Sequence, residues 1–173
     1  MTASAPGQPD VAGVFDRHQY AEFVLHDAAK ALETMVAEPS VRLMPTQAGG
    51  DGREAVYRFY RREFIPSLPP DLRVTLVSRT VGADRLVDED LLVYTQTREV
   101  PWLVPGVPPT GRRIEVPGIV IVEFQGGRVA RERVYWDQAS VLAQVGLLDA
   151  EQLPVVGHQA ARALRVLTRI PTP

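Results

Sequence analysis

The chain has 173 residues, of which 45% are hydrophobic and 23% charged, a composition typical of one globular domain with a sizeable core. The net charge of −2 leaves no basic excess, which argues against nucleic acid as a partner. Cysteine is absent, which excludes disulfides, thiolate nucleophiles and thiolate-bound metals.

Residues 1–12 are mostly small or polar and contain prolines, so we expect a disordered lead-in to a single domain over residues 13–170. This segment has no basic region followed by an apolar run, the pattern of a secretory signal. No apolar stretch approaches the roughly 18–20 residues that span a bilayer. We therefore expect a cytoplasmic protein that does not contact a membrane.

The first half of the chain predicts helices. Apolar residues at alternating spacings of four and three predict an amphipathic helix from about residue 14 to 37, ended by Pro39. A short apolar run at 41–44 predicts a strand, and the glycines of 49–52 predict a turn. A second helix over 56–64 should stop before Pro66, because the residue preceding a proline disfavours helical geometry.

After Pro70 the hydrophobic period changes to two, which predicts strands over 72–81, 85–98, 114–124 and 128–136. The last two strands should be joined by a tight turn at 125–127. Short helices are predicted at 140–148 and 158–167. Helices followed by an antiparallel meander indicate the α+β class.

The loop at 101–111 holds four prolines and two glycines, yet it also carries Trp102, Leu103 and Val104. A solvated loop would not expose such a triplet. We interpret the loop as a flap over the mouth of a cavity. The alternative is simple packing against the outer face of the sheet.

Asp137 stands at a strand-to-helix junction, four residues after Arg133 and next to Tyr135 and Trp136. A carboxylate walled by aromatic rings and near a guanidinium can act as a general acid or base. Asp is also a favoured N-cap, so the alternative is that Asp137 caps the following helix or pairs with Arg133.

His18 lies in the apolar stripe of the first predicted helix and could either line a pocket or form hydrogen bonds in the core. Metal sites require His and carboxylate side chains at ligand spacing, and the three His of this chain are scattered. We therefore expect no metal and no cofactor.

Four features carry a resemblance to a known family: Pro45-Thr46, the segment PGVPPTGRR at 105–113, the hairpin at Gly127, and Asp137 followed by QVGL at 144–147. On these features the chain resembles the SnoaL-like branch of the nuclear transport factor 2-like superfamily, over about residues 14 to 167. The resemblance implies a cone-shaped α+β fold. In it a curved antiparallel sheet wraps N-terminal helices around one pocket and a C-terminal helix follows. We also expect a homodimer formed through the outer sheet.

The resemblance implies that Asp137 is the acid/base, since cyclases of this family use an Asp that opens such a segment. A His on the third strand usually assists, and Gln96 in the run YTQT at 94–97 stands in its place. Gln96 and His18 would then orient the substrate or polarise an oxyanion, with Arg133 beside the carboxylate. Aromatic residues would form the pocket wall: Tyr20, Tyr60, Tyr94, Trp102, Tyr135 and Trp136.

A weaker similarity, in the run from Arg133 to Asp137, is to limonene-epoxide hydrolases of the same superfamily. The leading hypothesis is a cofactor-independent acid/base enzyme that cyclises, isomerises or eliminates from a small, mostly apolar organic molecule in an enclosed pocket. One alternative is an epoxide or lactone hydrolase in which Asp137 activates water. The other is a non-catalytic small-molecule-binding or dimerisation module.

Overall fold

A computed structural model describes residues 10–169, so most of the predicted lead-in lies outside the described part of the chain. Val11 and Ala12, which that prediction included, already belong to the first helix. The elements are α1 (Val11–Phe23), α2 (Ala28–Glu33), β1 (Met35–Leu43), β2 (Ala48–Asp51), α3 (Arg53–Phe59), η1 (Tyr60–Phe64), η2 (Ile65–Ser67), β3 (Arg73–Val81), β4 (Arg85–Thr95), β5 (Arg113–Gln125), β6 (Arg128–Trp136), α4 (Gln138–Val145) and α5 (Gln159–Thr168). Among these residues no helix is long and apolar enough to cross a membrane.

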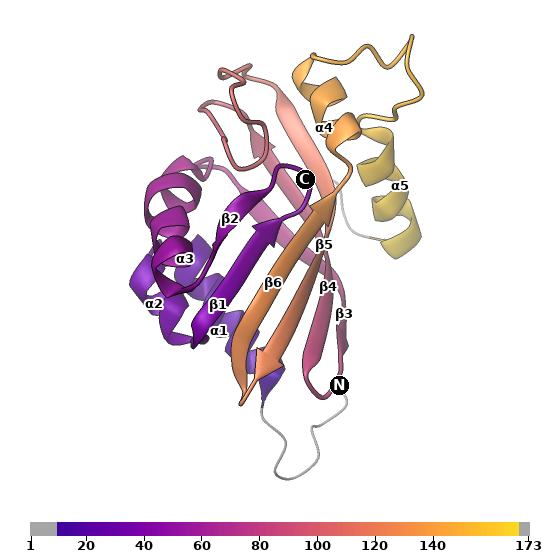
Figure 1. Cartoon of the computed structure of the whole chain (residues 1–173). Coiled ribbons are helices and arrows are strands. Elements are labelled where there is room, and N and C mark those ends of the chain that lie inside the picture. The colour runs from indigo at the N-terminus through magenta and orange to yellow at the C-terminus, as the bar shows by residue number, and fades with distance from the viewer. Residues whose placement is uncertain (1–9, 170–173) are drawn as a thin grey trace.

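The six strands form one curved sheet in the order β2-β1-β6-β5-β4-β3 (Figure 1). The α+β class is confirmed, with helices at both ends of the chain. Neighbouring strands run antiparallel except β1 and β6, which are parallel. A purely antiparallel sheet was therefore the wrong expectation at this pair. The long chain between β1 and β6 allows the parallel crossover that a short hairpin cannot make.

Helices cover the two faces of the sheet unequally. The N-terminal helices α1, α2 and α3 lie on one side, which we call the inner face (Figure 1). The main core fills the space between these helices and the sheet. On the outer face α5 packs against β5, where Ala161 joins Leu91 and Val93 of β4 in a small second core. The inner face is therefore the place where an internal site can form.

The predicted helix over 14–37 is wrong in its length, because it comprises two helices and the start of β1. The helical conformation is interrupted between α1 and α2, where His26 adopts a left-handed φ of 51°. Asp27 then caps α2 by accepting hydrogen bonds from the backbone N–H of Ala29 (3.0 Å) and Lys30 (3.1 Å). Apolar spacing continues across the break because both helices bury residues in the same core.

The other elements agree with the sequence to within a few residues, except that the glycines of 49–52 contribute to β2 and that the second helix ends in a π-helical turn, η1. The 101–111 loop packs against the inner layer rather than the outer sheet. Its Trp102 ring lies 5.0 Å from Phe64. The Thr46 hydroxyl donates to the Trp102 carbonyl (2.8 Å), and the Gln138 amide donates to the Leu103 carbonyl (3.0 Å).

Candidate active site

A small cavity of about 60 Å³ lies between the inner face of the sheet and the helical segments α1, α3 and η1. One water molecule needs roughly 10–15 Å³ on this measure, so the cavity has room for a small organic group. Most of the wall is apolar or aromatic. The lining residues are Gln19, Glu22, Phe23, Val41, Leu43, Phe59, Tyr60, Phe64, Val74, Asp90, Leu92, Trp102, Val120, Glu132 and Val134.

Behind one wall of the cavity lies His18, which is fully buried on α1. Its Nδ1 atom lies 2.7 Å from the Thr34 hydroxyl and 3.2 Å from the Ala31 carbonyl. The Thr34 hydroxyl donates its own proton to Ala31 (2.6 Å), so it can only accept from His18. Nδ1 therefore carries a proton, and the ring is held with Nε2 toward the cavity wall.

The Nε2 atom of His18 faces two buried carboxylates. Glu22 lies one helical turn further along α1, at 3.3 Å, and Glu132 reaches in from β6, at 3.4 Å. Burial alone would lower the pKa of His18, but the charges and hydrogen bonds of Glu22 and Glu132 outweigh it and raise the pKa to about 10. His18 is therefore an imidazolium at neutral pH, and its charge compensates one of the two carboxylates.

Tyr60 completes this group of four side chains. The π-helical turn η1 begins at Tyr60, and its hydroxyl lies 3.1 Å from His18 Nε2 and donates to Glu132 at 3.4 Å. Single π-helical turns are frequent at functional sites. Burial, together with the nearby charges of Glu22 and Glu132, raises the pKa of Tyr60 well above its ordinary value. Tyr60 therefore remains a neutral hydrogen-bond donor at the cavity wall.

Asp90 on β4 is the other carboxyl group of the wall, and it is 2% exposed. Within residues 10–169 no hydrogen bond or salt bridge holds its carboxyl group. Burial raises the pKa of Asp90 to about 7, aided by repulsion from Asp88 and opposed by Arg79. An acid with this pKa can give and take a proton at neutral pH, which is the property required of a general acid/base.

The neighbouring carboxylate, Asp88, is held in a different way although it lies on the same face of β4. Arg79 of β3 donates to both Asp88 oxygens, from Nε and Nη2, at 2.7 Å each. The remaining Nη1 of Arg79 donates to Asp16 of α1, also at 2.7 Å. Because Arg79 is occupied by these two carboxylates, it leaves Asp90 without an ion-pair partner.

Asp137 does not lie in this cavity. Its side chain is exposed and accepts hydrogen bonds from the backbone N–H of Ala139 (3.0 Å) and Ser140 (3.3 Å), which makes it the N-cap of α4. The capping alternative is thus confirmed, and the expected pocket position is wrong. Strand alternation explains the error: Asp137 follows Arg133 and Tyr135 onto the outer side of β6. The hydrolase alternative required Asp137 to activate water in the cavity, and Asp137 does not line it.

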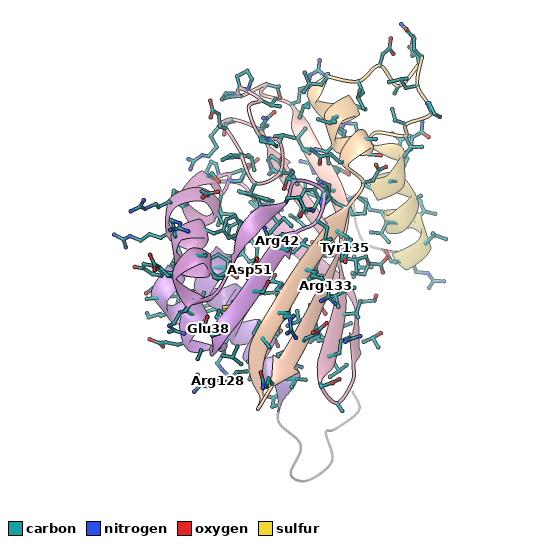
Figure 2. All side chains as sticks on the ribbon, in the orientation of Figure 1. Glu38, Arg42, Asp51, Arg128, Arg133 and Tyr135 are labelled. Carbon is teal, nitrogen blue, oxygen red and sulfur yellow. The ribbon has the colours of Figure 1, made fainter. Side chains whose placement is uncertain are left out.

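Two other predicted catalytic residues also lie elsewhere. Arg133 points to the outer face of the sheet, beside Tyr135 (Figure 2), and pairs with Glu123 at 2.9 Å. Gln96 is buried, but its side chain holds the 101–111 loop by accepting from the Thr110 hydroxyl (2.7 Å) and donating to the Pro108 carbonyl (3.4 Å). Of the four predicted catalytic residues, only His18 is next to the cavity.

Of the predicted aromatic wall, Tyr60 and Trp102 line the cavity. Tyr94 is buried but is not part of the lining, and Tyr20 and Tyr135 are 53% and 37% exposed. Trp136 donates its indole N–H to Gln138 (2.5 Å) outside the cavity. Three lining residues that sequence reasoning missed supply aromatic rings instead: Phe23, Phe59 and Phe64.

The acidic side chains of the site were also missed, although the sequence held a signal for Glu22 and for Glu132. Glu22 follows His18 by four residues, which places both on one face of a helix. Glu132 stands between Arg131 and Arg133, so once these arginines face outward Glu132 must face inward. The expectation that no His and carboxylates cluster is wrong, since ligand-capable atoms of His18, Glu22 and Glu132 lie within 4.8 Å of one another.

The sequence comparisons give the family. The SnoaL-like domain family matches residues 17–132, which include every polar residue of the cavity wall. The chain belongs to this family. No curated protein sequence matches it.

Solved structures with the same fold come from several bacteria. A candidate SnoaL-like polyketide cyclase from Jannaschia sp. CCS1 is 20% identical, with a TM-score of 0.66 over 86% of this chain and all of the other. IdmH, a candidate polyketide cyclase from Streptomyces antibioticus, is 22% identical, with a TM-score of 0.61 over 79% of this chain and 99% of the other. A nuclear transport factor 2-like protein of unknown function from Burkholderia pseudomallei is 16% identical, with a TM-score of 0.60 over 79% and 97%. The fold is therefore of the nuclear transport factor 2-like type.

Proposed function

We propose that the protein catalyses proton transfer on a small, largely apolar organic molecule in the cavity, with Asp90 as the general acid/base. The observation that carries the proposal is the Asp90 carboxyl group, which lines the cavity, is almost fully buried and has no hydrogen-bond partner within residues 10–169. A buried polar group without a partner is costly, and an enzyme can maintain it for a reacting substrate.

In this mechanism ionised Asp90 removes a proton from a carbon atom next to a carbonyl group. Negative charge then develops on the carbonyl oxygen and requires a hydrogen-bond donor. Tyr60 in the same wall supplies this donor when its hydroxyl proton turns from Glu132 to the substrate oxygen, and His18 Nε2 lies 3.1 Å from that hydroxyl. Return of the proton to another carbon gives isomerisation. Attack of the carbanion on a second carbonyl gives cyclisation, and the new alkoxide then takes the proton from Asp90.

Glu132 and Glu22 are positioning residues in this scheme, because they hold the His18 charge beside Tyr60. Relatives of the same fold that are described as candidate polyketide cyclases support this class of reaction. The catalytic role predicted for Asp137 and Arg133 is replaced by Asp90 and Tyr60. No redox or group-transfer step is required, so the proposed reaction is independent of a cofactor.

Trp102 is the wall residue that comes from the 101–111 loop, and it packs on Phe64. A substrate larger than the present cavity requires this side chain to move. The predicted flap is therefore part of the proposal: opening of the loop at Trp102 admits the substrate, and its closure excludes water.

The test measures exchange of the α-protons of cyclobutanone, a small enolisable ketone, for deuterium in D₂O by NMR. We expect the wild-type protein to accelerate exchange and Asp90→Asn to reduce the rate by about 10²–10⁴-fold. The matched control is Glu89→Gln, which removes the same charge from the opposite face of β4, where Glu89 accepts from Ser78 (3.0 Å). Binding of cyclobutanone without any acceleration by the wild type would instead support the non-catalytic binding module.

A further inference from the structure

The cavity wall carries an excess of negative charge. Three of its lining residues are acidic, Glu22, Asp90 and Glu132, and none of the lining residues is Arg or Lys. Among the residues that the structure describes, the one cation in direct contact with these groups is His18, which lies behind the wall and faces both glutamates. Three carboxyl groups therefore face a single imidazolium, so the acidic groups of the cavity wall outnumber their one cationic partner among residues 10–169.

The nearest buried arginine does not remove this excess. Arg79 forms short hydrogen bonds to Asp88 and Asp16, and these two carboxylates already outnumber its single charge. An uncompensated carboxylate in apolar surroundings is costly, because it has lost its hydration without gaining a partner. A positively charged ligand would supply the missing partner.

The rest of the wall suits an organic cation. Five aromatic side chains line the cavity, and the rings of Phe23, Phe64 and Trp102 form a continuous surface. Phe64 lies 5.8 Å from Phe23 and 5.0 Å from Trp102 between ring centroids. Aromatic faces attract alkylammonium groups, and the attraction is stronger where water is excluded. Carboxylates beside aromatic rings therefore provide both the charge and the apolar contact that such a group needs.

We propose that the cavity binds a small alkylammonium group, so that the substrate is an organic amine in its protonated form. This inference rests on the proposed function for the use of the cavity and deepens it by naming the substrate class. The carboxylates of the wall bind the ammonium charge, and the aromatic rings contact its alkyl groups.

A metal ion is the other cation that His18, Glu22 and Glu132 could hold, since their ligand atoms lie within 4.8 Å of one another. Metal binding requires an unprotonated His nitrogen. Here Nε2 faces two carboxylates that favour the proton, and Nδ1 is already a donor to Thr34. The aromatic wall contributes nothing to a metal but does contribute to an alkylammonium ion. The observations therefore favour the organic cation.

The test compares tert-butylammonium with tert-butanol, two probes of the same shape that differ in charge. We expect tert-butylammonium to bind at least about tenfold more tightly at pH 8 by calorimetric titration. It should shift the indole N–H signal of Trp102 in NMR spectra and leave that of Trp136 unchanged. Asp90→Asn should reduce the preference for the cation, whereas Glu89→Gln should retain it.

Equal affinities for the two probes, or a shift at Trp136 alone, would overturn the inference. So would binding of Zn²⁺ that excludes tert-butylammonium and is lost in His18→Asn, because the cluster would then be a metal site. The proposed function is tested separately. If the two probes bind with equal affinity while Asp90→Asn still abolishes ketone exchange, only the substrate class is wrong. If the cation binds but no exchange occurs, the binding site stands and the reaction is wrong.

Discussion

The two faces of the central sheet shift the pKa of similar acidic residues in opposite directions. On the inner face, burial raises the pKa of Glu132, and the hydrogen bond from His18 only partly offsets this. On the outer face, the hydrogen bond from Arg133 lowers the pKa of Glu123, with further help from Arg131. Figure 2 shows the outer face, where Arg133, Tyr135 and the Arg42–Asp51 pair lie beside solvent.

This difference supports the proposal that the functional site lies on the inner face. Exposed ion pairs are screened by water and contribute little to stability or chemistry. Buried carboxyl groups have altered proton affinities and strong electrostatic effects on whatever occupies the cavity. Neighbouring residues of β6 lie in the two different environments, since Glu132 faces inward and Arg131 and Arg133 face outward.

The largest effect is expected at His18. In His18→Leu, Glu22 and Glu132 lose their shared cation, so we expect the free energy of unfolding to fall by about 3–5 kcal/mol. Urea unfolding at pH 7 measures this change. His158→Leu is the control, because His158 is exposed and should change stability by less than about 0.5 kcal/mol.

The effect of His18 should also depend on pH. The folded-state pKa of about 10 lies above the ordinary value of 6.5, so the stabilisation is fully present below pH 6.5 and is lost as the pH rises through about 10. The difference between wild type and His18→Leu should therefore shrink between pH 7 and pH 10.5. A difference that stays constant over this range would show that His18 is neutral in the fold.

The second effect is a gain of stability. The folded-state pKa of Asp90, about 7, lies above the ordinary value of 3.8, so the stability of the fold falls as the pH rises from about 3.8 through about 7. Asp90→Asn removes this cost, and we expect it to raise the free energy of unfolding by roughly 2–4 kcal/mol at pH 8 and far less at pH 4. Urea unfolding of the wild type and of Asp90→Asn at pH 8 and at pH 4 measures this gain. An equal gain at the two pH values would contradict a raised pKa of Asp90.

A smaller effect is expected at Asp137. Asp137→Ala removes the N-cap of α4 and should lower the free energy of unfolding by about 1 kcal/mol. Asp137→Asn is the matched control, because Asn caps helices as well as Asp does. Both variants should exchange cyclobutanone protons at the wild-type rate. Loss of exchange in Asp137→Asn, with normal stability, would return the catalytic role to this residue.

The smallest effect is expected on the outer face. Arg133→Gln breaks the ion pair with Glu123, whose side chains are 29% and 20% exposed. We expect a change in the free energy of unfolding of less than about 1 kcal/mol and no change in ketone exchange. A larger loss of stability in thermal unfolding would mean that the outer face is covered, as in the predicted homodimer, and light scattering would then reveal dimerisation.

Most of the fold could be predicted from the sequence, because hydrophobic periods of two and 3.6 depend only on which side of an element is buried. The break between α1 and α2 could not, since apolar spacing continues across it and the left-handed His26 leaves no pattern. The site was harder to predict than the fold. Asp90 resembles an ordinary surface residue in the sequence, and only the closure of helices over the inner face buries it.

The resemblance gave the correct family and fold, but it placed the acid at Asp137. A strand end next to an aromatic pair is a local pattern, and a local pattern cannot distinguish a helix cap from a pocket acid. The position of Asp90 depends on contacts between β4, β6 and α1, which are far apart in the chain.

The most direct test of the account is a titration of the Asp90 side-chain carboxyl carbon by ¹³C NMR, assigned by comparison with Asp90→Asn. A midpoint near 7 is predicted, because the carboxyl group is buried beside Asp88 and lacks a hydrogen-bond partner within the described chain. A midpoint near 4 would show that Asp90 is hydrated or paired in solution. It would contradict its role as the acid/base of the cavity.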